Sequence, residues 1–323
     1  MTPCARSLGA VGVLVAVLAT GCAGPVPGPV GPSSLATPPP TSAGPSSVRP
    51  TPTSTPTVQP APKAEPTPKA EPTPKAEPTP KAEPTSCPRG DEVPEGLSLQ
   101  GERGRAWAFV PLDGSSPVTV EGRVSSSPAW STSKVLVVAA YLDTAVDGRP
   151  DRLGAADRRR IEAALTRSDA DAVTAIRDRI PGRAGPAMTA VLRSIGDTTT
   201  VAPDSYQGTM RWSLREQVRF TAALAEGRLV SSAASRYLRS TMHPISAHAW
   251  GLGRIGASAY KGGWLRKGTP TRQLGIVDGY AVAVSTELGT AVRQTDGDSA
   301  HVAQMNLLAR LLERRLAWER RCR

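Results

Sequence analysis

The stretch that decides the fold reads Ser131-Thr132-Ser133-Lys134, and the apolar run of residues 135–142 follows it directly. The change from polar to apolar residues predicts a buried helix with Ser131 at its N-terminus. Residues three apart share a helix face, so we expect the Lys134 amine to reach the Ser131 hydroxyl. A neutral lysine there could accept the serine proton and activate a nucleophile. The other interpretation is a helix cap followed by a solvated lysine.

Two more short motifs follow along the chain. Ser168-Asp169-Ala170 lies at the expected start of a helix. Lys261-Gly262-Gly263 lies on an expected strand, and Trp264 comes next. Ser-x-x-Lys, Ser-Asp-Asn and Lys-Thr-Gly, in this order, mark the penicillin-recognising serine hydrolases. Residues 100–318 therefore resemble this superfamily of class A β-lactamases and D,D-peptidases.

The hydrophobic pattern predicts the same order of elements. Strands are expected at 105–110, 118–120, 258–260, 275–277 and 280–285. Helices are expected at 131–144, 158–165, 169–180, 187–195, 213–225, 232–242 and 300–318. This order predicts an α+β fold, with helices inserted within a mostly antiparallel sheet. The resemblance implies a β-lactamase-like sheet flanked by helices, with a helical subdomain.

The resemblance also implies catalytic roles. Ser131 would be the acylated nucleophile and Lys134 its general base or proton relay. Ser168 would pass the proton toward the leaving nitrogen. Lys261 would bind the substrate carboxylate. Two partly desolvated lysines near one site disfavour each other's charge, so one of them is expected to be neutral near pH 7.

Backbone groups and glycines complete the expected site. The N–H groups of Ser131 and Trp264 would form the oxyanion hole. Gly262 and Gly263 would belong to the substrate-binding strand. No metal and no cofactor is expected. The expected ligand is a peptidoglycan stem peptide, a β-lactam or a related acyl compound.

Three departures from the family pattern bear on activity. Ala170 replaces the Asn whose amide grips the substrate's acyl side chain, and Gly262 replaces a Thr near the substrate carboxylate. Residues 196–210, which match the loop carrying the deacylating Glu, contain no Glu. Asp197 and Asp204 are either surrogate bases or, as we expect, a cap and a turn residue.

Two functions follow from these observations. The first is a serine hydrolase that works through an acyl-Ser131 intermediate. The second is a catalytically inactive relative that acts as an envelope binding or scaffold protein. Because two of the three motifs are degraded, the sequence does not decide between them.

The N-terminus predicts export and a lipid anchor. Residues 1–21 contain Arg6, a short apolar run and small residues, which is typical of a signal peptide. The run ends in Leu18-Ala19-Thr20-Gly21-Cys22, which resembles the lipobox of bacterial lipoproteins. Lipid on Cys22 would tether the protein to the outer face of the cell membrane. The alternative is cleavage by the ordinary signal peptidase.

A proline-rich segment separates Cys22 from the domain. Residues 22–86 are rich in Pro, Thr, Ser and Ala, so they cannot bury a core. The unit Pro-Lys-Ala-Glu-Pro-Thr occurs four times within residues 62–85. Such a chain favours polyproline II at about 3 Å per residue. We expect either a stalk that reaches the cell wall or a passive spacer.

The domain spans residues 87–323, and two cysteines lie close to its ends. Cys87 opens it and Cys322 almost closes it. In an exported protein a disulfide between them is expected to clip the termini together. The alternative is two free thiols.

Charge and the remaining motifs suggest no other chemistry. The net charge of +11 suits an anionic envelope surface, and the scattered Arg residues form no nucleic-acid motif. His243, His248 and His301 lack metal-site spacing. The pattern G-x-G-x-x-G at 251–256 precedes a strand, which argues against a dinucleotide site. Trp250 and Trp264 could line the cleft or pack in the core.

Overall fold

The computed structural model describes residues 92–264, 270–287 and 300–322, all within a compact unit that spans Pro78–Arg323. The predicted signal peptide, Cys22, the proline-rich segment and Cys87 lie outside these described residues. No helix of the described residues is long and apolar enough to cross a bilayer.

A five-stranded antiparallel sheet forms the centre of the domain. Its strands are β1 (Arg105–Pro111), β2 (Thr119–Arg123), β3 (Ala259–Gly263), β4 (Thr271–Val277) and β5 (Tyr280–Thr286). Their spatial order is β2-β1-β5-β4-β3, so the N-terminal hairpin pairs with the C-terminal strands. The expected α+β fold with an antiparallel sheet is confirmed.

The tightest turn of the sheet joins β4 to β5. Val277 pairs with Tyr280, which leaves only Asp278 and Gly279 in the loop. Both have positive φ, 47° and 81°. A two-residue Asp-Gly turn of this kind matches the twist of antiparallel strands. It sets the register that carries through to β1 and β3.

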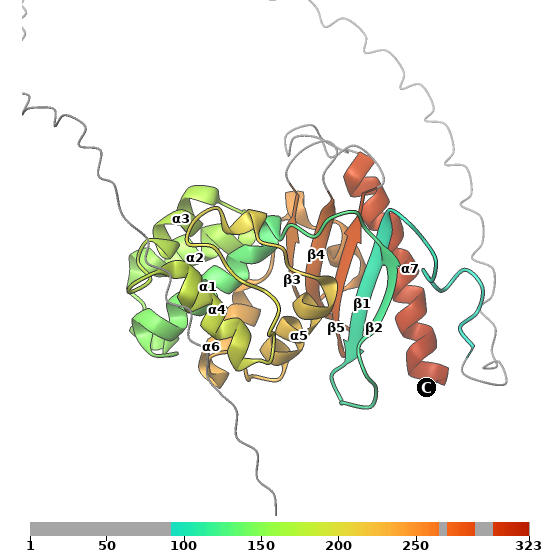
Figure 1. Ribbon diagram of the computed structural model, residues 1–323, viewed down its shortest axis with the longest axis horizontal. Helices are drawn as coiled ribbons and strands as arrows, with labels where there is room; N and C mark the ends of the chain where they lie inside the picture. The colour runs from blue at the N-terminus through green and yellow to red at the C-terminus, as the bar shows by residue number, and fades with distance from the viewer. Residues whose placement is uncertain (1–91, 265–269, 288–299, 323) are drawn as a thin grey trace, which may run out of the picture. The chain divides into compact units, whose positions relative to one another are not determined.

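Seven helices surround the sheet in the described ranges. They are α1 (Ser133–Val146), α2 (Ala155–Thr166), α3 (Ala170–Arg177), α4 (Ala184–Ser194), α5 (Leu214–Ala225), α6 (Ser232–Thr241) and α7 (Ala300–Cys322). Short 3-10 turns η1 (Trp130–Thr132), η2 (Pro150–Arg152), η3 (Gln207–Thr209), η4 (Ser246–His248) and η5 (Gly251–Ile255) connect them. Figure 1 shows α1 to α4 and α6 gathered beyond one side of the sheet, with α7 along the other.

Alternation along β1 divides the interior into two cores. Ala106 and Ala108 face a core built around α1 and α5, whereas Trp107 and Phe109 face a core shared with α7. Side chains of a strand alternate between faces, so one strand supplies both cores. The small residues let α5 approach closely, and the large ones fill the space under α7.

Helix ends differ from the predictions by a few residues. The helix expected over 169–180 ends at Arg177, and the one expected over 300–318 continues to Cys322. Ser213 caps α5, because its side chain accepts a hydrogen bond from the Glu216 N–H at 3.2 Å. Sequence patterns mark helix ends poorly because the last turn depends on what packs against it.

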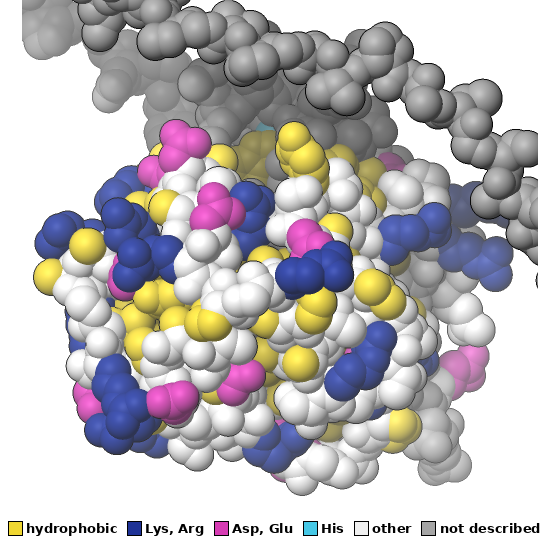
Figure 2. Space-filling view, turned by 60° about the vertical axis from the view of Figure 1, so that its left-hand side comes forward, with side chains coloured by type: hydrophobic (Ala, Val, Ile, Leu, Met, Phe, Trp, Pro, Cys, Tyr) yellow, Lys and Arg dark blue, Asp and Glu magenta, His cyan; other side chains and the backbone are white. Residues whose placement is uncertain are grey.

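Basic and acidic side chains are mixed on the helical face shown in Figure 2. Many pair locally, as in Arg177 with Asp178 and Arg183 with Asp204. The net positive charge is therefore spread over this face and forms no single stripe on it.

A buried arginine joins the two ends of the described domain. The Arg315 side chain on α7 is 1% exposed and contacts Glu121 and Glu319, each at 2.8 Å. It also donates to the Leu97 carbonyl oxygen at 3.0 Å. Glu121 in turn accepts hydrogen bonds from the Ser98 hydroxyl and the Leu99 N–H. This network fastens the segment before β1 to α7.

Replacing Arg315 by Met should lower the free energy of unfolding by about 3–5 kcal/mol, because it leaves buried carboxylates without their cation. Urea denaturation measures the change. The matched control is Arg314→Met, one residue away on the exposed side of α7, which should change it by less than about 0.5 kcal/mol. Equal effects of the two variants would contradict the role of the network.

Candidate functional site

Ser131 lies in the 3-10 turn η1, two residues before α1 begins. Trp130, directly before it, has a positive φ of 45°. A bulky residue in this region is strained, and such strain persists only where the surroundings hold it. The Trp130 indole donates to the Pro270 carbonyl oxygen at 3.1 Å, and the Ser133 hydroxyl donates to the Trp130 carbonyl oxygen at 2.6 Å. The turn thus holds Ser131 at the mouth of the helix.

Strand β3 passes directly against this turn. A Cβ atom on Gly263 would lie 3.0 Å from the Ser131 nitrogen and 2.9 Å from the Thr132 nitrogen. Backbone atoms cannot move aside easily, so only glycine fits at this position. The next residue, Trp264, lines the same cavity as Ser131. This close approach puts the two predicted oxyanion-hole residues side by side.

The structure brings together the two lysines and Ser168. The Lys261 amine on β3 donates to the Ser168 hydroxyl at 2.9 Å and to the Gly262 carbonyl oxygen at 2.9 Å. The Lys134 amine on α1 donates to the Ser168 carbonyl oxygen and lies 3.5 Å from its hydroxyl. No hydrogen bond joins Lys134 to Ser131, both of which the structure describes. Ser168 therefore sits between the two amines.

Ser168 reaches both amines because of its backbone. Its φ is 58°, in the left-handed region. Asp169 follows with φ −59° and ψ 125°, and its carboxylate accepts a hydrogen bond from the Ala172 N–H at 2.8 Å. The chain thus turns sharply just before α3. The turn presents the carbonyl oxygen of Ser168 to Lys134 and its hydroxyl to Lys261.

Both lysines have lowered pKa values. Burial lowers the pKa of Lys134 from its ordinary 10.5 to about 8, and the Asp169 carboxylate offsets part of this effect. The pKa of Lys261 lies well below its ordinary value because the amine is buried and because Lys134 is close. A neutral amine can accept a proton, so the site holds a base that works near neutral pH.

A cavity of about 750 Å³ opens in front of Ser131 and Lys134. Its walls come from η1, α3, η3 and Trp264. Ala170 and Arg177 line it from the two ends of α3. No Asp or Glu among the described residues lines it. The cavity can therefore hold a ligand against the serine, without a carboxylate to activate water.

An aromatic cluster accounts for one departure from the family pattern. The rings of Trp250 and Trp264 meet edge to face at 5.2 Å, and His248 contacts Trp264 at 5.3 Å. A Cβ atom on Gly262 would lie 3.2 Å from the Trp250 ring. Trp250 thus fills the space a larger residue would need at 262. Trp250 packs in the core, whereas Trp264 lines the cavity.

Neither aspartate of the 196–210 stretch lines the cavity with Ser131. Asp197 is fully buried and accepts hydrogen bonds from the N–H groups of Thr199 and Thr200. Asp204 pairs with Arg183, whose hydrogen bond lowers the pKa of that carboxyl and makes it a weaker base. The expected cap and turn roles agree with these contacts.

Several residues at the site were missed in the sequence. Trp130, Arg177, Tyr206 and Gln207 line the cavity, yet none belongs to a motif. Gln207 lies within residues 196–210, where the family pattern points to a carboxylate, so no motif marks its amide. His248 lacks metal-site spacing in the sequence, and in the structure burial and the nearby Lys261 lower its pKa.

The glycine pattern at 251–256 serves packing. A Cβ atom on Gly253 would lie 2.3 Å from the Tyr260 hydroxyl oxygen, and one on Gly251 would lie 2.1 Å from the Gln273 side-chain oxygen. Among the described residues, no group of three or more His, Cys, Asp or Glu side chains could hold a metal. Cys87 lies outside the described residues, so its disulfide with Cys322 stays a prediction.

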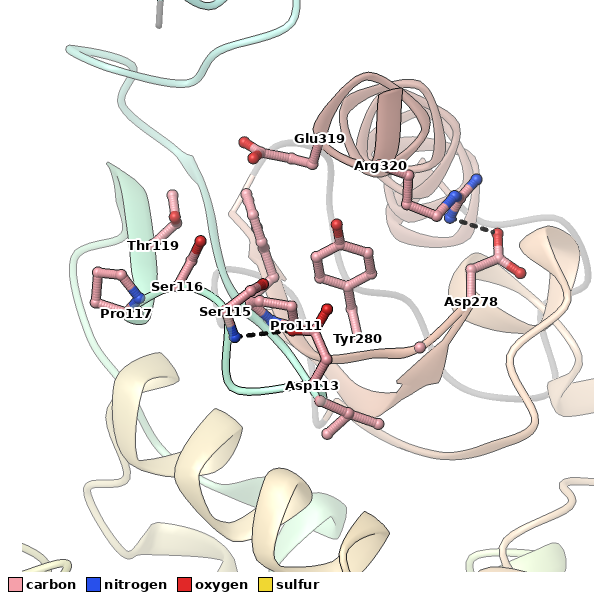
Figure 3. Close-up of a pocket in the computed structure, with 13 residues that line it drawn as sticks. Pro111, Asp113, Ser115, Ser116, Pro117, Thr119, Asp278, Tyr280, Glu319 and Arg320 are labelled. Atoms are coloured by element: carbon pink, nitrogen blue, oxygen red, sulfur yellow. Dashed lines mark hydrogen bonds and ion pairs between the residues drawn. The ribbon is translucent and has the colours of Figure 1, made fainter. Parts of the chain in front are cut away.

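A separate cavity of about 540 Å³ lies at the other end of the sheet. Tyr280 forms its floor, between Ser116 of the β1–β2 loop and Glu319 of α7 (Figure 3). Tyr280 pairs with Pro111 at the strand end opposite to Gly263. This cavity includes none of the predicted catalytic residues.

Comparison with solved structures defines the fold. The chain is similar to PBP-A, at 20% identity with a TM-score of 0.50, over 67% of this chain and 90% of that one. It is similar to the β-lactamase of Sphaerobacter thermophilus, at 17% identity and TM-score 0.50, over 67% and 91%. For the TLA-1 extended-spectrum β-lactamase the values are 15%, 0.51, 66% and 92%.

These likenesses establish that the domain has the fold of class A β-lactamases and PBP-A. No family model matches the sequence, and no curated protein matches it. The sequence identities are too low to carry over an activity.

The pKa of Lys134 can be measured directly. The domain contains only three lysines, Lys134, Lys261 and Lys267, so ¹³C-lysine NMR gives few signals. We expect Lys134 to titrate near pH 8. Asp169→Asn should lower this value further, because it removes a charge that favours the ammonium form yet keeps an oxygen that caps α3.

The control for this titration is Asp171→Asn, which removes an exposed acid from the first turn of the same helix. It should leave the Lys134 midpoint almost unchanged. A midpoint of 10 or above in the wild type would show that the amine is solvated and not poised as a base.

Proposed function

We propose that the domain is a serine hydrolase that forms an acyl-Ser131 intermediate with a peptidoglycan-related or other acyl substrate. The observation that carries the proposal is the chain of contacts from Lys134 through Ser168 to Lys261. Burying two amines around one hydroxyl is costly, and groups with such perturbed pKa values cluster at functional sites. The fold shared with PBP-A and the class A β-lactamases supports the same chemistry.

In the proposed reaction the Ser131 hydroxyl oxygen attacks the substrate carbonyl carbon. Neutral Lys134 accepts the hydroxyl proton as the new C–O bond forms. The N–H groups of Ser131 and Trp264 stabilise the oxyanion. Ser168 passes the proton to the leaving nitrogen as the C–N bond breaks. Water later hydrolyses the acyl ester and returns Ser131 to its starting form.

The acyl-enzyme is expected to persist. Release requires a base that activates water, and no Asp or Glu of the described residues lines the cavity. A variant of PBP-A, which shares this fold, was solved as an acyl-enzyme complex with penicillin G. A penicillin is therefore a suitable probe, although the substrate in the cell need not be a β-lactam.

Incubation with a fluorescent penicillin, followed by intact mass spectrometry, tests the proposal. The wild type should gain one adduct, and Ser131→Ala should gain none. Ser194→Ala, which alters an exposed serine at the end of α4, should be labelled like the wild type. An unlabelled wild type would refute the proposed hydrolase function and favour the binding or scaffold function. Label on Ser131→Ala would refute the site.

We also propose that lipid on Cys22 anchors the protein to the outer face of the membrane, where the proline-rich segment holds the domain away from the surface. The mature protein should partition into the detergent phase of a Triton X-114 extraction, and Cys22→Ser should move it to the aqueous phase. A wild type found in the aqueous phase would indicate cleavage by the ordinary signal peptidase.

A further inference from the structure

Gln207 presents an amide to the cavity in front of Ser131. It is the first residue of η3, is only 8% exposed, and lines the cavity. Arg177, the last residue of α3, donates from its guanidinium to the Gln207 side-chain oxygen at 3.2 Å. A guanidinium can only donate, so the amide oxygen must face Arg177. The NH₂ group therefore points away from Arg177.

That NH₂ group has no protein acceptor among the described residues. The NH₂ nitrogen is not sealed from solvent, so it keeps accessible surface. In the free protein this donor can bond to water, and an acceptor atom on a ligand could take the place of that water.

The amide lies beside the proposed nucleophile. A Cβ atom on Gly208 would be 3.4 Å from the Trp130 Cα atom, which shows that η3 packs against η1. Because Trp130 and Ser131 are neighbours in η1, a ligand acylated at Ser131 would pass next to Gln207.

Arg177 acts here as a clamp for the amide and not as a site for an anion. Its guanidinium also donates twice to the Asp178 carboxylate, at 3.0 and 2.8 Å. The charge of Arg177 is therefore paired. Its remaining role at the cavity is to hold the Gln207 oxygen and so to orient the NH₂ group.

Helix α3 supplies no amide of its own to the cavity. Ala170 begins α3 and Arg177 ends it, and residues seven apart share a helix face. Both line the cavity. At its start α3 offers only a methyl group, and at its end it holds the amide of Gln207.

We propose that Gln207 is the substrate-recognition amide of this cavity and donates a hydrogen bond to the carbonyl oxygen of an acylamino group on the ligand. This rests on the proposed function, in which the ligand is acylated at Ser131. The cavity should therefore bind N-acylated compounds more tightly than their free-amine analogues. The amide comes from η3, whereas the family motif would place an amide at position 170.

Two probes differ in the group that Gln207 would recognise. Benzylpenicillin carries an acylamino side chain, and 6-aminopenicillanic acid carries an amine at the same place. Their dissociation constants are measured by titration calorimetry in the Ser131→Ala protein, so that no covalent step intervenes. Gln207→Leu should weaken benzylpenicillin about 5- to 30-fold and 6-aminopenicillanic acid less than about 2-fold.

Two more variants separate recognition from packing. Arg177→Met leaves the amide in place but removes its clamp, so it should cause a smaller loss that is again confined to benzylpenicillin. Gln100→Leu makes the same change at an exposed position outside the cavity and should leave both constants unchanged. Equal weakening of both probes by Gln207→Leu, no weakening of either, or no binding to the Ser131→Ala protein would overturn the assignment.

Labelling of the wild type keeps this result distinct from the proposed function. Selective binding that depends on Gln207, combined with no covalent adduct in the wild type, would refute the hydrolase and leave the recognition role standing. Covalent adducts that form equally fast with both probes, in the wild type and in Gln207→Leu alike, would refute the recognition role and leave the hydrolase standing.

Discussion

The structure depends on two lysines that share one serine hydroxyl in the protein interior. Lys134 comes from α1, Lys261 from β3, and Ser168 from the turn before α3. Desolvation makes each ammonium costly, and a folded protein tolerates this only when the partners are held in place. The contact joins the helical part of the domain to the edge of the sheet, so folding itself assembles the proposed proton path.

Close packing of backbone supports that contact. Gly263 lets β3 approach the turn that carries Ser131, and Trp250 and Trp264 occupy the space above Gly262. Gly262, the position at which the third motif departs from the family pattern, therefore faces an aromatic cluster that leaves little room for a larger side chain. Loss of a side chain from a family motif need not mean loss of the site, since neighbouring side chains can fill or replace it.

In the cavity, too, side chains from other positions take the place of family-motif residues. Ala170 supplies no polar group, and the loop of residues 196–210 supplies no carboxylate to the cavity. The loop instead brings Gln207 against η1, with its oxygen held by Arg177. In the proposed reaction, a cavity without a carboxylate would retain the acyl group longer than it would take to form it.

The sequence by itself determined the α+β fold, the order of the elements and the identity of the two buried lysines. It could do so because hydrophobic periodicity and the spacing of Ser131 and Lys134 are local properties of the chain. Only the tertiary structure decided that Lys134 bonds to Ser168, that Asp204 pairs with Arg183, and that Gln207 reaches the cavity. These contacts join segments that are distant in sequence or lie in irregular loops. No local pattern encodes them, because packing around Gly263, Trp250 and Arg177 determines which side chains meet.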